Sequence, residues 1–250
     1  MRRRAAVLLA LTVLAGPVRA DMPAECRVAR HLVDDTPRLT GTAAALAAKH
    51  LNVLVLGAGS SVLPGKGGEN LAYPERLRVA LSEEMPGIKV TLATDVTPHR
   101  TATAMVESLA TDLGKAKPDL LVWQTGTVDA MQGIDPDQFN QALDKGIGIA
   151  KAAGADVVLI NAQYSPRTES IIALGNYSEI MRWVAAQHEI PLFDRFAVMR
   201  LWADLGTFDF FTVTKKLDTA GRVHDCIGRL LAALVAEAAK PEVPPGPGGK

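Results

Sequence analysis

The stretch NVLVLGAGSS, residues 52–61, decides the fold of this chain. Its first half is an almost unbroken aliphatic run, as expected for a strand of a parallel sheet that is buried on both faces. Its second half consists of glycine, alanine and serine, whose small side chains let the backbone turn sharply where the strand ends. We therefore predict a buried strand over residues 52–56 and a tight turn that presents Ser60 or Ser61 at the carboxyl edge of a sheet.

The same pattern recurs along the chain, with apolar runs separated by amphipathic stretches. Further strands are predicted at residues 88–94, 119–125, 156–162 and, in a shorter run, 191–196. Helices are predicted at residues 73–84, 101–115, 136–153, 177–188 and 222–239, with a short one at 42–49. Strands that alternate with helices are typical of an α/β fold, and we predict a doubly wound parallel sheet in three layers.

The composition fits a globular protein and argues against one class of partner. Hydrophobic residues make up 48% of the 250 residues and charged residues 22%, which is enough apolar material for one α/β core. The formal net charge is zero and only 5% of the residues are aromatic. We therefore expect no nucleic-acid binding through a basic surface or a base-stacking platform. No cluster of His, Cys and carboxylate residues has metal-ligand spacing, so no metal is predicted.

The first twenty residues have the features of a cleaved signal peptide. Three arginines at residues 2–4 precede an apolar run at residues 5–15, and the tripeptide Val-Arg-Ala at residues 18–20 forms a small-residue cleavage signal. The apolar run is too short to span a bilayer. Cleavage leaves 23 basic and 27 acidic residues, a net charge of −4. We predict a periplasmic or secreted bacterial protein with no membrane span after cleavage.

The rest of the chain is predicted to form one body with two flanking segments. Residues 21–50 form an N-terminal extension, and residues 51–240 form the folded domain. Residues 241–250 are rich in proline and glycine and are predicted to be disordered. We find no internal repeat and no linker inside the domain.

The chain has two cysteines, Cys26 and Cys226. In an oxidising compartment an even pair can form one disulfide, which would tie the N-terminal extension to the last helix. Two separate buried thiols are the alternative, because free cysteine packs as a small apolar side chain.

The glycines of the first loop do not complete a nucleotide-binding motif. A dinucleotide fingerprint that starts at Gly57 would need its third glycine at Val62. A phosphate loop whose lysine is Lys66 would need a glycine at Ser60 and a hydroxyl residue at Gly67. We therefore predict no nucleotide cofactor, and we interpret the loop as a turn that presents a nucleophilic serine.

Several segments resemble the sequence blocks of the SGNH/GDSL hydrolase superfamily. Residues 59–65 (Gly-Ser-Ser-Val-Leu-Pro-Gly) resemble its first block, Gly-Asp-Ser-Leu-Thr-x-Gly, which implies a nucleophile at Ser61. Residues 73–77 (Tyr-Pro-Glu-Arg-Leu) resemble the start of the helix that follows, and residues 118–127 resemble the approach to the third block. The resemblance implies a flavodoxin-like α/β/α fold with a five-stranded parallel sheet in the order 2-1-3-4-5.

The chain also resembles an exported α-proteobacterial branch of this superfamily. Members of that branch carry one cysteine soon after the signal peptide and another in the last helix. Cys26 and Cys226 match these two positions. The resemblance thus implies that the two cysteines are paired.

Three positions depart from the pattern of the superfamily. Ser60 stands where the first block has Asp. Pro98, which has no N–H to donate, stands where the second block has a Gly that binds the oxyanion, and Val128 replaces the oxyanion-binding Asn of the third block. The loss of one such donor typically costs about 100-fold or more in rate. The catalytic blocks are therefore eroded in this chain.

The last block of the superfamily, Asp-x-x-His, fits this chain in two registers. Alignment on the histidine makes His224 the general base, with Gly221 in place of the orienting Asp. Alignment on Cys226 places the Asp of the block at Lys215 and its His at Asp218, which leaves no base. The second register is slightly favoured, because it preserves the last helix without gaps, but both stay open at this point.

The resemblance and the strand ends together define the predicted site. Ser61 is the candidate nucleophile, and His224, or else His99, is the candidate base. The candidate oxyanion-binding and substrate-binding residues follow the first three strands and are Ser60, Arg100, Gln124, Gly126 and Asp129.

Two functions of different classes follow from this reading. The first is an exported SGNH/GDSL-type serine hydrolase, an esterase or O-acyl hydrolase that acts on an ester of a glycan or a lipid, with acyl transfer as a variant. The alternative is a catalytically degenerate protein of the same fold that binds an acylated glycan or assists polysaccharide assembly. The expected partner in both cases is a small-molecule or glycan ester, and the oligomeric state stays open.

Overall fold

The computed structural model describes residues 22–29, 32, 36–212 and 217–240. The predicted signal peptide, the predicted tail at residues 241–250 and Lys215 lie outside the described residues. The described chain forms a single five-stranded parallel sheet in the order β2-β1-β3-β4-β5. The strands are β1 (His50–Gly57), β2 (Lys89–Val96), β3 (Leu120–Gln124), β4 (Asp156–Ile160) and β5 (Leu192–Phe193). This sheet confirms the predicted fold class and strand order.

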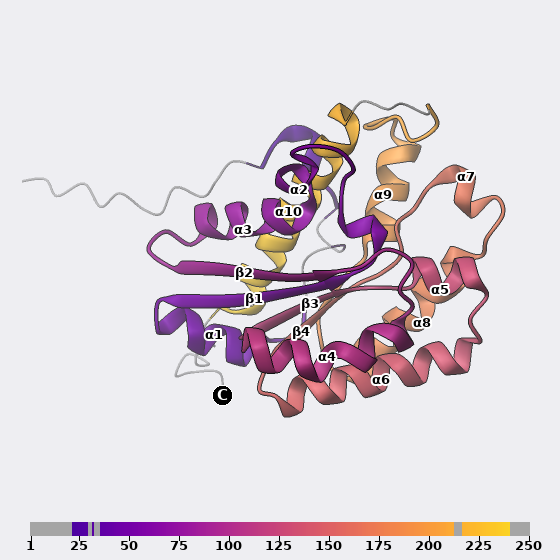
Figure 1. The fold of residues 1–250 in the computed structure, drawn as a ribbon. Helices are drawn as coiled ribbons and strands as arrows, with labels where there is room; N and C mark the ends of the chain where they lie inside the picture. The colour runs from indigo at the N-terminus through magenta and orange to yellow at the C-terminus, as the bar shows by residue number, and fades with distance from the viewer. Residues whose placement is uncertain (1–21, 30–31, 33–35, 213–216, 241–250) are drawn as a thin grey trace, which may run out of the picture.

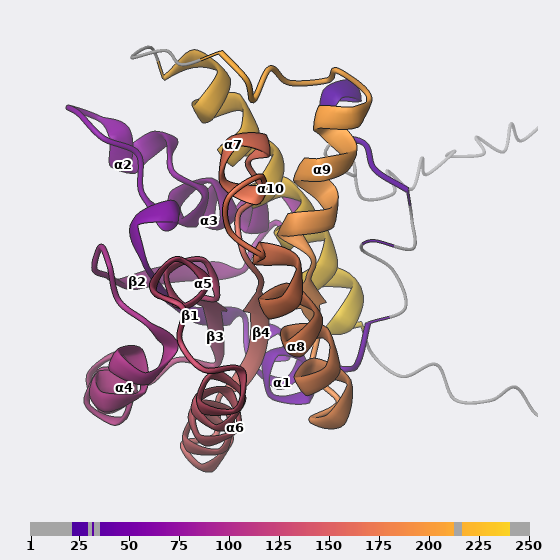
Figure 2. The same cartoon turned by 90° about the vertical axis from the view of Figure 1, so that its right-hand side faces the viewer.

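Helices cover both faces of the sheet and make three layers (Figures 1 and 2). The helices are α1 (Thr40–Ala47), α2 (Gly68–Leu71), α3 (Tyr73–Glu84), α4 (Ala102–Ala116), α5 (Thr127–Gln132), α6 (Pro136–Ala152), α7 (Pro166–Glu169), α8 (Leu174–Gln187), α9 (Arg195–Asp204) and α10 (Asp218–Ala238). Two 3-10 turns, η1 (Ala24–Cys26) and η3 (Gly59–Ser61), complete the elements that matter for the site. Within the described residues, no helix is both long and apolar enough to cross a membrane.

Alternation along the strands divides the interior into two cores. In β1, Val53 and Val55 face a core that is closed by α3, α9 and α10, whereas Leu54 and Leu56 face a second core closed by α4, α6 and α8. A strand with side chains buried on both faces needs apolar residues at every position. This requirement explains why the aliphatic run of residues 53–56 marks the strand so clearly.

The structure differs from the sequence-based expectation at two helix starts. The apolar segment at residues 191–196 is a strand only to Phe193, because the Asp194 side chain accepts a hydrogen bond from the Ala197 N–H and begins α9. The last helix begins at Asp218 rather than at residue 222, so His224 lies in the second turn of α10 and not in its first. The sequence did not predict the short helices α2, α5 and α7 or the longer helix α9.

Helix α10 packs closely on α3, and a glycine makes this contact possible. A Cβ atom at Gly228 would lie 2.6 Å from the Cβ of Arg76 and 2.7 Å from the backbone nitrogen of Leu77. These distances are far shorter than any van der Waals contact, so only glycine fits where α10 approaches the backbone of α3. The contact fixes the position of the first turns of α10, which carry His224.

The disulfide between Cys26 and Cys226 is present and confirms the predicted pairing. Both cysteines are buried, and the bond joins η1 to α10 across 200 residues of sequence. Glu25 and Arg222 add an ion pair on the surface beside it. The segment before β1 is thereby tied to the helix that closes one of the two cores.

We predict that the double variant Cys26→Ser/Cys226→Ser has a markedly lower free energy of unfolding than the oxidised protein. In the chain-entropy description, closing a loop of roughly 200 residues contributes about 5 kcal/mol, as an upper limit. Urea unfolding of the oxidised wild type and of the double variant measures the difference. The wild type unfolded with a reducing agent is the control and should behave like the variant. Two thiols that alkylate in the non-reduced protein would contradict the pairing.

Candidate functional site

The site begins with the turn after β1, where the lack of a side chain at Gly57 lets the Ser61 side chain pack against the backbone. A Cβ atom at this position would lie 2.3 Å from the Oγ of Ser61, so any other residue would collide with the serine. The turn continues as η3, in which the Ser61 N–H donates to the carbonyl of Ala58 at 2.9 Å. Ser61 thus folds back over the end of its own strand and becomes fully buried.

Gln124, the last residue of β3, binds this turn through one oxygen atom. Its Oε1 accepts hydrogen bonds from the Ser61 hydroxyl at 2.8 Å, the Ser60 hydroxyl at 3.0 Å and the Ala58 N–H at 3.4 Å. Both serine protons therefore point at a neutral amide oxygen. An amide oxygen does not take up a proton at neutral pH, so Gln124 holds the serines without activating them.

Tyr73, the first residue of α3, closes the network from the other side. Because Ser61 donates its proton to Gln124, the Tyr73 hydroxyl is the donor in the 3.0 Å hydrogen bond between Tyr73 and Ser61. Burial raises the pKa of Tyr73 to about 12, so the phenol stays protonated. The hydroxyl of Ser61 is thus both donor and acceptor within a closed network of neutral groups.

His224 serves as a helix cap. Its Nδ1 accepts a hydrogen bond of 3.0 Å from the Tyr73 N–H at the start of α3, where no other side chain caps the helix. The proton of the neutral ring is therefore on Nε2. Burial, and then the charge of Arg195, lower the pKa of His224 to about 3. Within the described part of the chain, no hydrogen bond joins His224 to Ser60 or Ser61.

The described chain provides no carboxylate to orient His224. Gly221 lies one turn earlier in α10, where the His224 register requires an Asp. Asp218 is exposed at the first position of the helix, and Asp225 pairs with Arg229 at 2.9 Å. A general base is most effective when its pKa lies near the working pH and a partner holds its ring. His224 meets neither condition in this arrangement.

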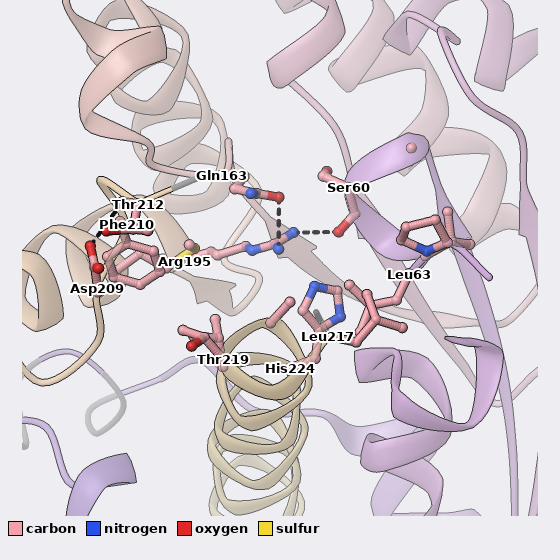
Figure 3. A pocket seen from close by; sticks show the side chains of 16 residues that line it. Ser60, Leu63, Gln163, Arg195, Asp209, Phe210, Thr212, Leu217, Thr219 and His224 are labelled. Carbon is pink, nitrogen blue, oxygen red and sulfur yellow. Dashed lines mark hydrogen bonds between the residues drawn. The ribbon is translucent and has the colours of Figure 1, made fainter. Parts of the chain in front are cut away.

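A cavity of about 440 Å³ opens beside this network. It lies between residues 59–64, the loop after β4 at Gln163, the start of α9 at Arg195 and residues 217–224 at the start of α10 (Figure 3). Ser60 lines this cavity. Ser61 borders instead a second depression, of about 460 Å³, between α3 and the edge strand β2.

Arg195 lies at the floor of the first cavity and is fully buried. Its Nη1 donates to the backbone carbonyl of Ser60 at 3.0 Å, and its Nη2 donates to Oε1 of Gln163 at 3.1 Å. The guanidinium carbon lies 5.7 Å from the centre of the Tyr73 ring. Burial lowers the pKa of Arg195 to about 10, so the side chain is still a cation at neutral pH.

The sequence reading did not single out Arg195. It lies inside the apolar segment at residues 191–196, which was expected to be a strand. The sequence feature that could have identified it is the charged pair Asp194-Arg195 within an otherwise apolar segment, which is unusual for a buried strand. Gln163, at the carboxyl end of β4, meets Arg195 here because the ends of parallel strands share one edge.

Arg100 does not reach the cavity. Its guanidinium donates to Asp95, near the end of β2, at 2.6 Å and to the hydroxyl of Ser108, in the middle of α4, at 2.7 Å. The expected role in binding an oxyanion does not fit this geometry, because the charge is already paired with Asp95. His99, the alternative base, is exposed, and no hydrogen bond links it to either serine in the described chain.

Gly126 and Asp129 have a structural role at the carboxyl edge of the sheet, where Asp129 links the loop after β3 to the start of α4. The buried carboxylate of Asp129 accepts hydrogen bonds from the N–H of Gly126 at 3.2 Å and from the N–H of Ala102, the first residue of α4, at 2.8 Å. Burial raises the pKa of Asp129 despite these bonds. Neither residue lines the cavity. Within the described residues, no group of three or more His, Cys, Asp or Glu side chains is placed to hold a metal ion.

The lowered pKa of His224 gives the fold a pH dependence of defined sign. The pKa is about 3 in the folded protein and 6.5 in the ordinary histidine. Between these values the unfolded chain binds a proton that the folded chain does not. The free energy of unfolding should therefore fall as the pH falls below about 6.5, by up to about 1.4 kcal/mol per pH unit.

The variant His224→Asn tests this dependence, because the Asn side chain oxygen can also accept the Tyr73 N–H. We predict that the free energy of unfolding falls less steeply in this variant than in the wild type between about pH 6.5 and pH 5. Urea unfolding at several pH values measures both slopes, and His99→Asn is the control for replacing a histidine. Parallel slopes for the wild type and His224→Asn would show that the ring is protonated in the folded protein.

Three solved structures show the same fold at low sequence identity. TesA is 24% identical, with 73% of this chain and 98% of TesA covered and a TM-score of 0.59. A variant of Axe2, an acetyl-xylooligosaccharide esterase from Geobacillus, is 13% identical, with coverages of 74% and 94% and a TM-score of 0.61. A two-domain esterase active on acetylated mannans is 15% identical, with coverages of 84% and 57% and a TM-score of 0.65.

The family itself is indicated by the sequence profile of the non-GDSL lipase-like family, which matches residues 25–241. No curated protein matches the chain. The profile covers the whole sheet, both cysteines and the cavity, and it agrees with the predicted resemblance. The chain belongs to the non-GDSL lipase-like family, within the SGNH/GDSL hydrolase superfamily.

Proposed function

We propose that this chain binds an acylated carbohydrate in the cavity beside Ser60 and does not hydrolyse it through Ser61 and His224. The proposal rests on one observation, the cap that His224 forms on α3. The cap fixes the tautomer in which Nε2 carries the proton, and Nδ1, the one unprotonated ring nitrogen, already accepts the Tyr73 N–H at 3.0 Å. A ring held in this way, with a pKa of about 3, is a poor general base at neutral pH.

The other requirements of serine hydrolysis support the same reading. The proton of Ser61 points at the amide oxygen of Gln124, which cannot remove it. Pro98 and Val128 occupy the positions at which the superfamily resemblance implies oxyanion donors. Each missing donor costs about 100-fold or more in rate, so an ester bound here would be turned over very slowly.

The cavity has the size and lining for a short sugar with an ester group. Its volume of about 440 Å³ lies within the usual range of ligand sites. Met199, Leu217 and Val223 offer apolar surface for an acyl group, while Gln163 and Thr219 offer hydrogen bonds to hydroxyls. The esterases that share the fold act on acetylated xylooligosaccharides and acetylated mannans. The leader-like residues 1–20 and the disulfide support a periplasmic or secreted location.

A serine hydrolase is the second candidate function. It is favoured by the family, which is lipase-like, and by the Ser60 hydroxyl, which borders the cavity. In this case a carbohydrate or lipid ester would be cleaved, and the network around Gln124 would have to rearrange so that a base reaches Ser60 or Ser61.

Acetylated xylooligosaccharides distinguish the two functions. We predict saturable binding by calorimetry, with no acetate release above the buffer blank and no labelling by a fluorophosphonate probe. Thr219→Trp, which fills the cavity, should weaken binding by about tenfold or more. Leu205→Trp, at a site that is 70% exposed and outside the cavity, is the matched control and should bind normally.

Either of two results would overturn the proposal. Acetate release that disappears in Ser60→Ala or Ser61→Ala would identify a serine hydrolase. Equal affinity of Thr219→Trp and Leu205→Trp, or no binding by the wild type, would show that the cavity is not the site of an acylated carbohydrate.

A further inference from the structure

Arg195 is a buried cation without a counter-charge among the described residues. Its ring contact is with Tyr73, and its two hydrogen bonds go to neutral oxygens, the Ser60 carbonyl and the Gln163 amide. Its Nε has no hydrogen-bond partner in the described chain. A buried charge is unfavourable unless an opposite charge compensates it. The uncompensated charge and the free Nε together make Arg195 a candidate anion-binding group.

The partly buried arginines of the described residues have a carboxylate partner. Arg100 pairs with Asp95 at 2.6 Å, and Arg229 pairs with Asp225 at 2.9 Å. Asp194, next to Arg195 in sequence, pairs with Arg182 at 2.6 Å and also caps α9. The carboxylate closest in sequence is thus already used, and Arg195 differs from the partly buried arginines of the described residues in having no carboxylate partner.

The position of the guanidinium is fixed before any ligand arrives. The Ser60 carbonyl holds Nη1, and the aromatic face of Tyr73 lies beside the planar group. Figure 3 shows the guanidinium between Gln163 and Ser60, with His224 close by. A cation that is held rigidly at the floor of a cavity loses little entropy when it binds an anion.

The free and the weakly held N–H groups lie on the same edge of the guanidinium. Nε and Nη2 form the side of the fork that a carboxylate binds with two parallel hydrogen bonds. Nε is free, and Nη2 is held only by the neutral oxygen of Gln163 at 3.1 Å. A carboxylate makes stronger hydrogen bonds to arginine than an amide oxygen does, so it can displace Gln163 from this edge.

We propose that Arg195 anchors a carboxylate-binding subsite, with Gln163 as the group that the carboxylate replaces. This inference rests on the proposed function and narrows its ligand to an acidic carbohydrate. The charge fits at most a monoanion, because Arg195 is the one cationic side chain among the described residues that line the cavity, and Asp209 already contributes a negative charge there.

Glucuronate and glucose form a matched pair of probes, since they differ only in the carboxylate. Titration of the wild type, followed by the Nε–Hε NMR resonance of Arg195, should show saturable shifts with glucuronate. The dissociation constant for glucuronate should be about tenfold or more below that for glucose, and added salt should reduce the difference. Acetate tests whether a carboxylate without a sugar is sufficient, and inorganic phosphate tests a different anion.

Variants separate a ligand-binding role from a purely structural one. Arg195→Lys keeps the charge but loses the fork, and should weaken glucuronate binding by about tenfold without changing glucose binding. Gln163→Ala removes the displaced group and should bind glucuronate at least as tightly as the wild type. Far-ultraviolet circular dichroism checks the folding of each variant, and the wild-type titration decides the question if Arg195→Lys does not fold.

Three outcomes would overturn the subsite. These are equal affinities for glucuronate and glucose, an Arg195 resonance that does not move with glucuronate, and tighter binding of phosphate than of glucuronate. These failures differ from that of the proposed function, which would be acetate release or a lack of cavity binding with a neutral acetylated oligosaccharide.

Discussion

One oxygen atom, the Oε1 of Gln124, organises the carboxyl edge of this sheet. It ends β3 and accepts hydrogen bonds from Ala58, Ser60 and Ser61, so it fixes the turn after β1 against the neighbouring strand. The position of Ser60 in turn sets the backbone carbonyl that holds Arg195. Because this oxygen belongs to a neutral amide, it accepts hydrogen bonds from the Ser60 and Ser61 hydroxyls and holds the turn without removing a proton from either serine. A single side chain thus positions both serine hydroxyls and, through the Ser60 carbonyl, contributes to the orientation of the buried cation.

Two titratable residues at the carboxyl edge of the sheet, His224 and Asp129, cap helices. The first N–H groups of a helix have no partner within the helix, and burying one without a partner costs about 1–3 kcal/mol. His224 satisfies the N–H of Tyr73 at the start of α3, and Asp129 satisfies that of Ala102 at the start of α4. Both side chains come from elements distant in sequence. A histidine and an aspartate near two serines therefore need not form a catalytic set, because the geometry commits each of them to a different helix.

The parts of the fold that the sequence predicts are those with a local cause. Four aliphatic residues in succession identify β1, and the predicted ends of the helix at residues 73–84 match α3. The bonds of Asp129 to Ala102 and of His224 to Tyr73 could not be read in this way, because each partner lies in another element and depends on how the layers pack. Arg195 was missed for a related reason. Its apolar neighbours favoured a strand, whereas the Asp194 cap on the Ala197 N–H begins a helix at the very residue that carries the charge.

The disulfide has a further consequence for the order in which the chain matures. Cys26 precedes every strand and Cys226 follows them all, so the bond turns the whole sheet into one covalent ring. On a chain that emerges N-terminus first, the first thiol must wait until the last helix has appeared before it meets its partner. The disulfide can therefore form only after all five strands have been synthesised. The disulfide is thus a late step in the maturation of the chain, and a chain truncated before α10 cannot form it because it lacks Cys226.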